Sequence, residues 1–188
     1  ISGYAELLKN GMVKSGDVKP VATKIYDEAQ RMVRLVEDII NLSHLDEGAE
    51  DMIKEEVDLY DIVSSTIESL SPEAEAAGVT VSFSGRHVSV NGISQLLSGI
   101  VYNLCDNAIK YHRQGGSVSV SLSSEDKDAV LTVSDTGIGI PTEHQQRIFE
   151  RFYRVDKSHS KEVGGTGLGL SIVKHAAKIH DAKIKLSS

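Results

Sequence analysis

The feature that most constrains the fold of this chain is a regular alternation of apolar and small polar side chains. It is clearest in SVSVSLS at 117–123 and AVLTVSD at 129–135, and it recurs in VTVSFS at 79–84, HVSV at 87–90 and KIKLS at 183–187. Successive side chains of a strand point to opposite faces of its sheet, so this pattern predicts a sheet with one covered and one wet face. Such sheets are largely antiparallel, whereas buried parallel sheets show continuous apolar strands.

Three segments among these strands have helical periodicity instead, at 58–77, 91–112 and 167–180. Pro72 is a possible break in the first of them, because a proline inside a helix removes a backbone hydrogen bond. Helices that accompany a half-covered sheet pack on its apolar face. We therefore expect an α+β fold, a two-layer α/β sandwich with a mixed, largely antiparallel sheet.

The N-terminal region is expected to form an α-helical hairpin that precedes the sandwich. Residues 1–16 contain a short helix, and 17–47 place apolar side chains three and four positions apart in a heptad-like stripe, formed by Ala22, Ile25, Ala29, Met32, Leu35, Val36, Ile39 and Leu42. The short first helix has too little apolar surface to cover this stripe. A second copy of the chain would complete a bundle, which predicts a homodimer; the alternative is that the stripe packs on the rest of the same chain.

The acidic segment 46–56 interrupts the stripe and has the composition of a linker. We therefore expect two domains, a helical hairpin with its linker at 1–54 and the α/β sandwich at 55–188.

The charge and cysteine content exclude several classes of function. The net charge is −7 and no block of lysine and arginine occurs, so we expect binding neither to nucleic acid nor to an anionic membrane surface. Cys105 is the only cysteine, which excludes an internal disulfide and a cysteine-rich metal site and is consistent with the reducing cytosol. No apolar run is long enough to span a membrane. We expect a cytoplasmic chain, attached to a membrane only through parts outside these residues.

The first motif with chemical meaning is GGTGLGL at 164–170, directly before a helix. Free N–H groups and the dipole at a helix N-terminus attract phosphate, and glycine lets the backbone approach it closely. The motif is neither a Walker loop, which needs a lysine after glycine, nor a dinucleotide fingerprint, which follows a buried strand. Glycine clusters also form ordinary turns, so this signal is weak by itself.

The second motif is DTGIG at 135–139, at the end of an expected strand. A carboxylate such as Asp135 accepts a hydrogen bond from the exocyclic amine of adenine, and two glycines let a flat ring pass close to the backbone. An Asx turn that ends the strand explains Asp135 and Gly137 without any ligand.

The third motif is NLCDNAIKY at 103–111, inside a long helix. Asn103, Asn107 and Lys110 fall on one helical face, and asparagine is a poor residue for a helix interior. An amide oxygen can ligate Mg²⁺, which prefers oxygen ligands together with water and substrate phosphates, and Lys110 can offset phosphate charge. A solvated polar face is the alternative explanation.

These three motifs, in this order and with IFERFYR at 148–154 between the last two, closely resemble the ATP-binding domain of sensor histidine kinases of two-component systems. The resemblance covers nearly the whole chain, because the N-terminal segment is similar to the dimerisation and phosphotransfer hairpin of that family. It implies ATP and Mg²⁺ as cofactors, with Asn107 as the magnesium ligand and Asp135 on adenine. The residues that it places on the nucleotide are Asn103, Asn107, Lys110, Tyr111, Asp135, Gly137, Gly139, Ile140, Tyr153, Arg154, Gly165, Thr166, Gly167, Leu168, Gly169 and Leu170.

The resemblance also implies the reaction and the partners. The γ-phosphoryl group of ATP passes to a histidine and then to an aspartate of a response regulator receiver domain. In the family the accepting histidine lies just upstream of a segment like ISGYAELL at 1–8, so we expect it before Ile1 and assign no catalytic residue here. His44 is followed by Leu45 rather than by an acidic residue, which makes it a poor acceptor. Asp181 replaces a glycine of the family after the last helix, and Asp tolerates left-handed geometry better than most residues.

Two other functions remain possible. Related ATPases, such as DNA gyrase and heat-shock chaperones, carry a glutamate one helical turn before the magnesium asparagine to activate water. Here that position is Asn103, whose amide accepts no proton, so we expect negligible hydrolysis. A nucleotide-binding module without phosphoryl transfer is the other alternative.

Overall fold

The computed structural model describes residues 1–46, 52–126, 128–155 and 165–188. A three-stranded sheet has the order β2 (Thr80–Gly85), β4 (Ser117–Glu125), β5 (Asp128–Asp135). β2 runs parallel to β4, and β4 runs antiparallel to β5, so the sheet is mixed as predicted. A separate antiparallel pair joins β1 (Glu55–Asp58) to β3 (Ser89–Gly92).

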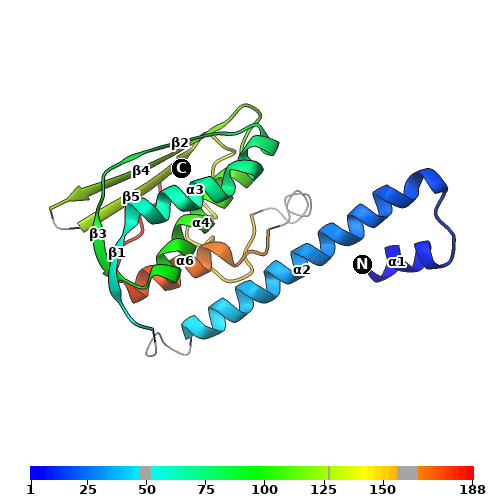
Figure 1. Ribbon diagram of the computed structural model, residues 1–188, viewed down its shortest axis with the longest axis horizontal. Coiled ribbons are helices and arrows are strands. Elements are labelled where there is room, and N and C mark those ends of the chain that lie inside the picture. The colour runs from blue at the N-terminus through cyan, green and yellow to red at the C-terminus, as the bar shows by residue number, and fades with distance from the viewer. Residues whose placement is uncertain (47–51, 127, 156–164) are drawn as a thin grey trace.

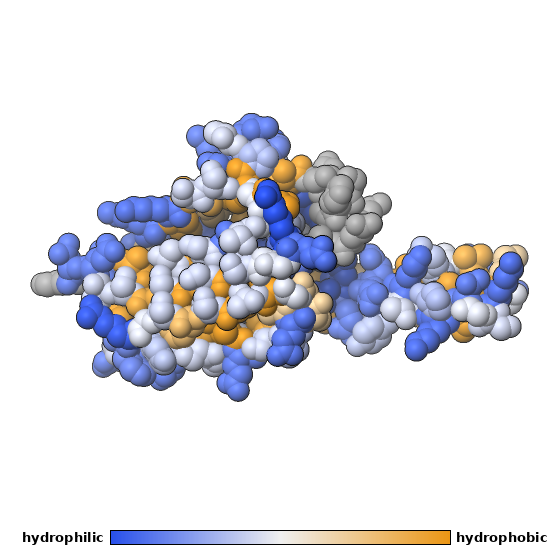
Figure 2. All heavy atoms as spheres, turned by 90° about the horizontal axis from the view of Figure 1, so that it is seen from above, coloured by the Kyte–Doolittle hydropathy of each residue, from blue (hydrophilic) through white to orange (hydrophobic). Residues whose placement is uncertain are grey.

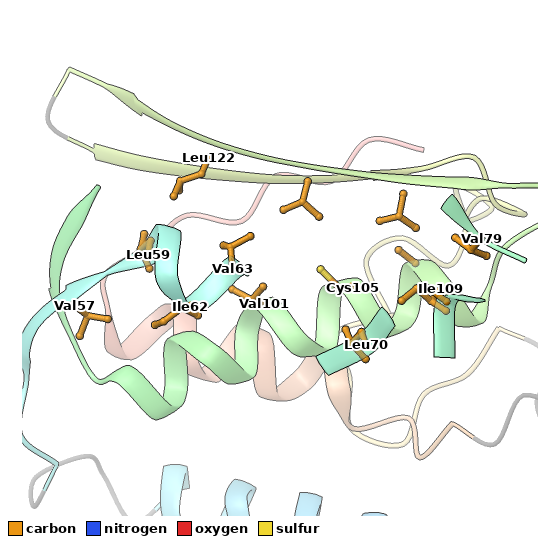
Figure 3. Packing of buried hydrophobic residues seen from close by; sticks show 14 residues of the cluster. Val57, Leu59, Ile62, Val63, Leu70, Val79, Val101, Cys105, Ile109 and Leu122 are labelled. Atoms are coloured by element: carbon orange, nitrogen blue, oxygen red, sulfur yellow. The ribbon is translucent and has the colours of Figure 1, made fainter. Parts of the chain in front are cut away.

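The helices α3 (Leu59–Ala77), α4 (Ser94–Lys110) and α6 (Gly169–Ile179) lie on one side of the sheet, which gives the two-layer sandwich that the sequence predicts (Figure 1). Along β4 the side chains of Val118, Val120 and Leu122 are buried, and the serines between them are more exposed. The alternation therefore separates the two faces of the strand. Figure 3 shows the resulting core between the sheet and the helices, with Val63 and Val101 at its centre.

The structure corrects the sequence-based element boundaries in three places. α3 continues through Pro72, because this residue is exposed and the carbonyl oxygen that loses its N–H partner can face water. α4 begins at Ser94 rather than near Asn91, because residues 89–92 pair with β1. The expected strand at 183–187 carries no strand assignment, since alternation makes a strand only where a ladder partner is present.

The N-terminal hairpin consists of α1 (Ser2–Lys9), a 3₁₀ turn η1 (Ser15–Asp17) and the long α2 (Val18–Asp46). It projects from the sandwich, and hydrophobic atoms are exposed on the projecting part (Figures 1 and 2). The exposed large apolar side chains of α2 are Val18, Tyr26, Met32, Val33, Val36, Ile39 and Ile40. Of the stripe, Ala22, Met32, Val36 and Ile39 are exposed among the described residues, so about half of it is open to a second copy of the chain. None of the helices in the described ranges has the length and apolar character needed to cross a membrane.

The C-terminal half of α2 behaves differently, because it packs against the sandwich. Leu42 is buried in a second core with Leu96 of α4 and with Leu168 and Ile172, and Leu35 packs against the same cluster. The end of the stripe therefore packs on the same chain, as one alternative expected, and pairing of the exposed part with a second copy stays a prediction.

Candidate functional site

The site begins on the polar face of α4. Asn103, Asn107 and Lys110 are all half-buried, whereas Cys105 and Ala108, which point elsewhere on the helix, belong to the main core. The Asn103 side-chain amide donates to the carbonyl of Gly99 at 2.8 Å. This bond satisfies one amide donor inside the helix and leaves the Asn103 oxygen directed elsewhere.

Two ionisable residues share one end of this face. Lys110 Nζ forms an ion pair with Asp106 one turn away, at 2.5 Å. The pair keeps the ammonium near the end of α4, where a helix C-terminus favours positive charge. To offset the charge of a phosphate, the ammonium would have to share this contact with Asp106 or exchange it for a phosphate oxygen.

Tyr111, directly after α4, contacts both glycine segments, the first at 135–139 and the second at 165–170. Its carbonyl oxygen accepts from the N–H of Ile138 at 3.1 Å. A Cβ on Gly137 would overlap this same carbonyl, so only glycine allows the approach. At the other end of the side chain, Tyr111 Oη lies 3.5 Å from where a Cβ would stand on Gly165. The two segments, far apart in sequence, therefore meet at one residue.

Asp135 forms the Asx turn that the sequence allowed as an alternative. Its Oδ1 accepts from the N–H of Gly137 at 2.8 Å, and the residue is exposed at the end of β5. A carboxylate has two oxygens, so this turn and acceptance from an amine are compatible. Gly139 has a φ of +73°, and the N–H of Ile140 donates to Ser188 Oγ at 2.7 Å, which ties this segment to the C-terminal residues.

Tyr153 of the aromatic segment 148–154 contacts two residues that precede this segment. His144 Nδ1 lies 2.6 Å from Tyr153 Oη, and the Arg147 guanidinium lies 4.3 Å from the centroid of the tyrosine ring. Phe152 has a positive φ of 61° and donates its N–H to the carbonyl of Gly167 at 2.9 Å. This bond joins the aromatic segment to the second glycine segment.

The glycine segment 165–170 rests directly on α4 through Gly169. A Cβ on this residue would lie only 2.5 Å from Asn103 Oδ1, so any side chain at position 169 would require the Asn103 amide to move. Arg154 Nη2 lies 4.0 Å from the corresponding position on Gly165. The structure thus brings Asn103, Tyr111 and Arg154 together around this segment.

Leu168 and Leu170 differ in what they can offer a ligand. The Leu168 side chain is fully buried in the second core, whereas Leu170 is only half-buried. The N–H of Leu168 donates to Thr166 Oγ1 at 3.3 Å. Leu168 therefore anchors the segment, and any contact that it makes with nucleotide must come from its backbone.

No sequence pattern pointed to a further partner of this segment, Asp38 of α2. Thr166 Oγ1 donates to Asp38 Oδ2 at 2.6 Å, a contact across 128 positions of sequence. Burial raises the pKa of Asp38, against the lowering effects of the Thr166 hydrogen bond and of Lys110. His144 was also missed, because a lone histidine near an aromatic motif has many structural roles.

The donor set suits a magnesium ion that arrives with phosphate rather than one held by protein alone. Within the described ranges, no three His, Cys, Asp or Glu residues are grouped so as to hold a metal ion. Asn107 offers an amide oxygen on the half-buried face that Lys110 shares. One protein oxygen together with phosphate oxygens and water is a coordination that Mg²⁺ accepts.

Two family models match this chain. The model for histidine kinase-, DNA gyrase B- and HSP90-like ATPases matches residues 92–188. The model for the His Kinase A (phospho-acceptor) domain matches residues 1–48. The matches cover the nucleotide motifs and the helical hairpin.

Curated relatives align with nearly the whole of this chain. The sensor-like histidine kinase SenX3 of Mycobacterium tuberculosis is 38% identical over 192 residues, which cover 99% of this chain and 47% of that protein. The sensor histidine kinase WalK of Bacillus subtilis is 31% identical over 185 residues, which cover 96% of this chain and 30% of that protein. The chain thus spans about half the length, or less, of the relatives it matches.

Solved structures agree with the fold. The mycobacterial sensor histidine kinase MprB matches with a TM-score of 0.61 and 32% identity, over 69% of this chain and 81% of that one. Full-length ShkA in complex with AMPPNP matches with a TM-score of 0.70 and 26% identity, over 94% of this chain and 37% of that one. The histidine kinase AdeS of Acinetobacter baumannii, at 21% identity and a TM-score of 0.75, supports the fold alone; it covers 95% of this chain and 81% of its own.

Proposed function

Because this chain belongs to the histidine kinase-, DNA gyrase B- and HSP90-like ATPases, and within them to the sensor histidine kinases, we propose that it binds Mg-ATP for phosphoryl transfer to a histidine. The resemblance of the hairpin to that of sensor histidine kinases implies that this histidine lies upstream of Ile1. From there the phosphoryl group passes to an aspartate of a response regulator receiver domain. The observation that carries the proposal is the meeting of both glycine segments at Tyr111, beside the polar face of α4.

Each part of the site has a distinct task in this proposal. Asp135 accepts from the adenine amine, while Asn107 holds Mg²⁺ and Lys110 offsets phosphate charge. When bound, Mg²⁺ supplies positive charge next to the triphosphate. Catalysis of phosphoryl transfer depends mainly on positioning and charge neutralisation. The backbone of residues 165–170, which we call the phosphate cradle, together with Lys110 and Asn107 can supply both.

The remaining predicted contacts complete the cradle. Tyr153 and Arg154 flank the nucleotide, and the backbone of Gly165, Gly167 and Gly169 approaches the phosphates. Tyr153 is well suited to this task because His144 and Arg147 restrict its ring. A restricted side chain loses little entropy when it meets a ligand.

Hydrolysis is the competing function, and Asn103 argues against it. Its amide is already a donor to Gly99 and cannot take a proton from water at neutral pH. We therefore expect ATP turnover close to the uncatalysed background. Turnover by the wild-type chain well above that of an Asn107→Ala variant would favour the ATPase instead.

Phosphoryl transfer can be tested directly with a longer chain. We would extend the protein upstream of Ile1 to include the complete first helix of the hairpin and incubate it with γ-labelled Mg-ATP. A histidine kinase acquires protein-bound label that survives base but not acid, and Asn107→Ala abolishes this label. Release of free phosphate alone would support hydrolysis, and neither product would support a nucleotide-binding module.

We propose that two copies of the chain dimerise through the hairpin. The receiver domain belongs to a separate response regulator that binds this dimer. The exposed apolar side chains of α2 support dimerisation. We place the chain in the cytosol, because that compartment supplies ATP and keeps the single thiol reduced. Attachment to a membrane would then come only from other parts of the intact protein.

A further inference from the structure

One side of helix α2 packs near the second glycine segment, residues 165–170. Leu35, Asp38 and Leu42 are three and four positions apart, so they lie along one side of the helix. The two leucines pack into the second core, which also contains Leu168 and Ile172. Figure 1 shows α2 passing α6 on the side away from the sheet. The apolar contacts of Leu35 and Leu42 therefore position the Asp38 carboxylate next to the start of the glycine segment.

The receiving group is the hydroxyl of Thr166. Its Oγ1 donates to Asp38 Oδ2 at 2.6 Å and accepts from the N–H of Leu168 at 3.3 Å. A threonine hydroxyl has one proton to donate. While Asp38 takes that proton, Thr166 cannot donate it to a phosphate oxygen.

Charge adds to this competition. Asp38 is half-buried, and the acidic groups of Glu37 and Asp106 and the ammonium of Lys110 act on it. Like charges repel strongly where water is partly excluded. An ionised Asp38 at the edge of the cradle is therefore unfavourable for a triphosphate.

We propose that Asp38 is a positioning residue that lowers the affinity of the site for nucleoside triphosphate, because the docked hairpin holds Thr166 away from the phosphates. The inference rests on the proposed function, since it assumes that ATP phosphates lie at the glycine segment. Binding of ATP and docking of α2 then oppose each other. Thermodynamic linkage makes the effect mutual, so bound ATP loosens the hairpin.

The test compares affinities of the 188-residue chain for Mg-AMPPNP and for adenosine by isothermal titration calorimetry. Asp38→Ala is expected to tighten AMPPNP binding on the order of tenfold, the scale of one hydrogen bond to a charged group, and to leave adenosine unchanged. Asp38→Asn keeps an acceptor but removes the charge, so it is expected to fall between Asp38→Ala and wild type. Glu37→Ala is the matched control, because it removes the same charge from an exposed neighbour.

A double mutant isolates the hydroxyl contact. With Thr166→Val in place, Asp38→Ala is expected to change AMPPNP affinity by less than it does alone, because the shared hydrogen bond is already gone. Full additivity, an equal effect of Glu37→Ala, an equal effect on adenosine, or weaker AMPPNP binding by Asp38→Ala would each overturn the inference. In all of these cases wild-type binding of AMPPNP still supports the proposed function. A wild-type chain that binds neither ligand contradicts the proposed function and the inference together.

Discussion

At the scale of single residues, the contact between Gly169 and Asn103 decides whether the glycine segment can rest on α4. The hypothetical Cβ of Gly169 lies 2.5 Å from Asn103 Oδ1 but 3.7 Å from Asn103 Cβ. A Gly169→Ala variant is therefore expected to lose about 1 kcal/mol of stability, because the Asn103 amide must leave its position and its hydrogen bond to Gly99. Urea denaturation measures this loss.

Truncation of the opposing side chain supplies the control. Asn103→Ala removes the atoms that collide and leaves an ordinary contact, so the double variant is expected to be more stable than Gly169→Ala alone. If Gly169→Ala matches the wild type in its denaturation midpoint, the close approach is absent in solution.

The thiol of Cys105 is expected to be inert in the folded protein. Burial, with a smaller contribution from Asp106, raises its pKa to about 11 from an ordinary value of 9.0. The reactive thiolate is therefore scarce at pH 8, and iodoacetamide is expected to modify the native chain far more slowly than the urea-unfolded chain. Mass spectrometry after timed quenching measures both rates, and equal rates would mean that the helix packing around Cys105 opens readily.

The same shift fixes the sign of a pH effect. An unfolded thiol ionises near pH 9.0 and the folded one near 11, so unfolding releases a proton between these values. The contribution of Cys105 to stability is present below pH 9 and is lost as the pH rises toward 11. A Cys105→Ala variant is expected to lose less stability than the wild type over this interval.

At the scale of elements, the end of α3 depends on one left-handed residue. Gly78 has a φ of +67° and donates its N–H to the carbonyls of Ala74 and Glu75. A Gly78→Ala variant is expected to be about 1 kcal/mol less stable, because an alanine in this conformation is strained. Thermal denaturation would show a lower midpoint.

Gly99, inside α4, is the matched control for this substitution. A Cβ there meets nothing within 4 Å. Gly99→Ala is expected to add about 1 kcal/mol, because alanine favours helix more than glycine does. Changes of the same sign at both positions would contradict the assigned backbone conformations.

At the scale of the whole molecule, α2 has two apolar faces with different partners. Leu35 and Leu42 pack on the sandwich, whereas Val36 and Ile40 are exposed. A proposed second copy would cover the exposed face, and docking and dimerisation then use separate surfaces. The hairpin can therefore change its contact with the sandwich while the dimer stays together.

Dimerisation can be tested on the exposed face. Val36→Glu is expected to convert a dimer into a monomer, because it places a charge in an apolar helix contact, and light scattering coupled to gel filtration would report half the mass. Gln30→Glu introduces the same residue at an exposed position on another side of α2 and is expected to leave the dimer intact. A wild-type chain that is monomeric at high micromolar concentration would contradict the proposal.

Local patterns were sufficient for much of the fold. The alternation along β4 and the helical periodicity of α3, α4 and α6 were predictable because each depends on residues close together in sequence. The left-handed geometry of Asp181, with a φ of 52°, agrees with the family resemblance, in which a glycine holds that place. The nucleotide motifs were recognisable for the same reason, since each is a continuous stretch. The domain boundary at 54 and the roles of the individual site residues stay predictions.

The sequence by itself determined the two kinds of element, the sandwich that they form and the family of the site. Only the tertiary structure decided the pairing of β1 with β3, the missing ladder at 183–187, the contact of His144 with Tyr153 and the hydrogen bond from Thr166 to Asp38. Periodicity and turn chemistry act over a few residues and leave a trace in the sequence. Contacts between distant segments depend on how whole elements pack, and a single polar pair across 128 positions leaves no pattern to read.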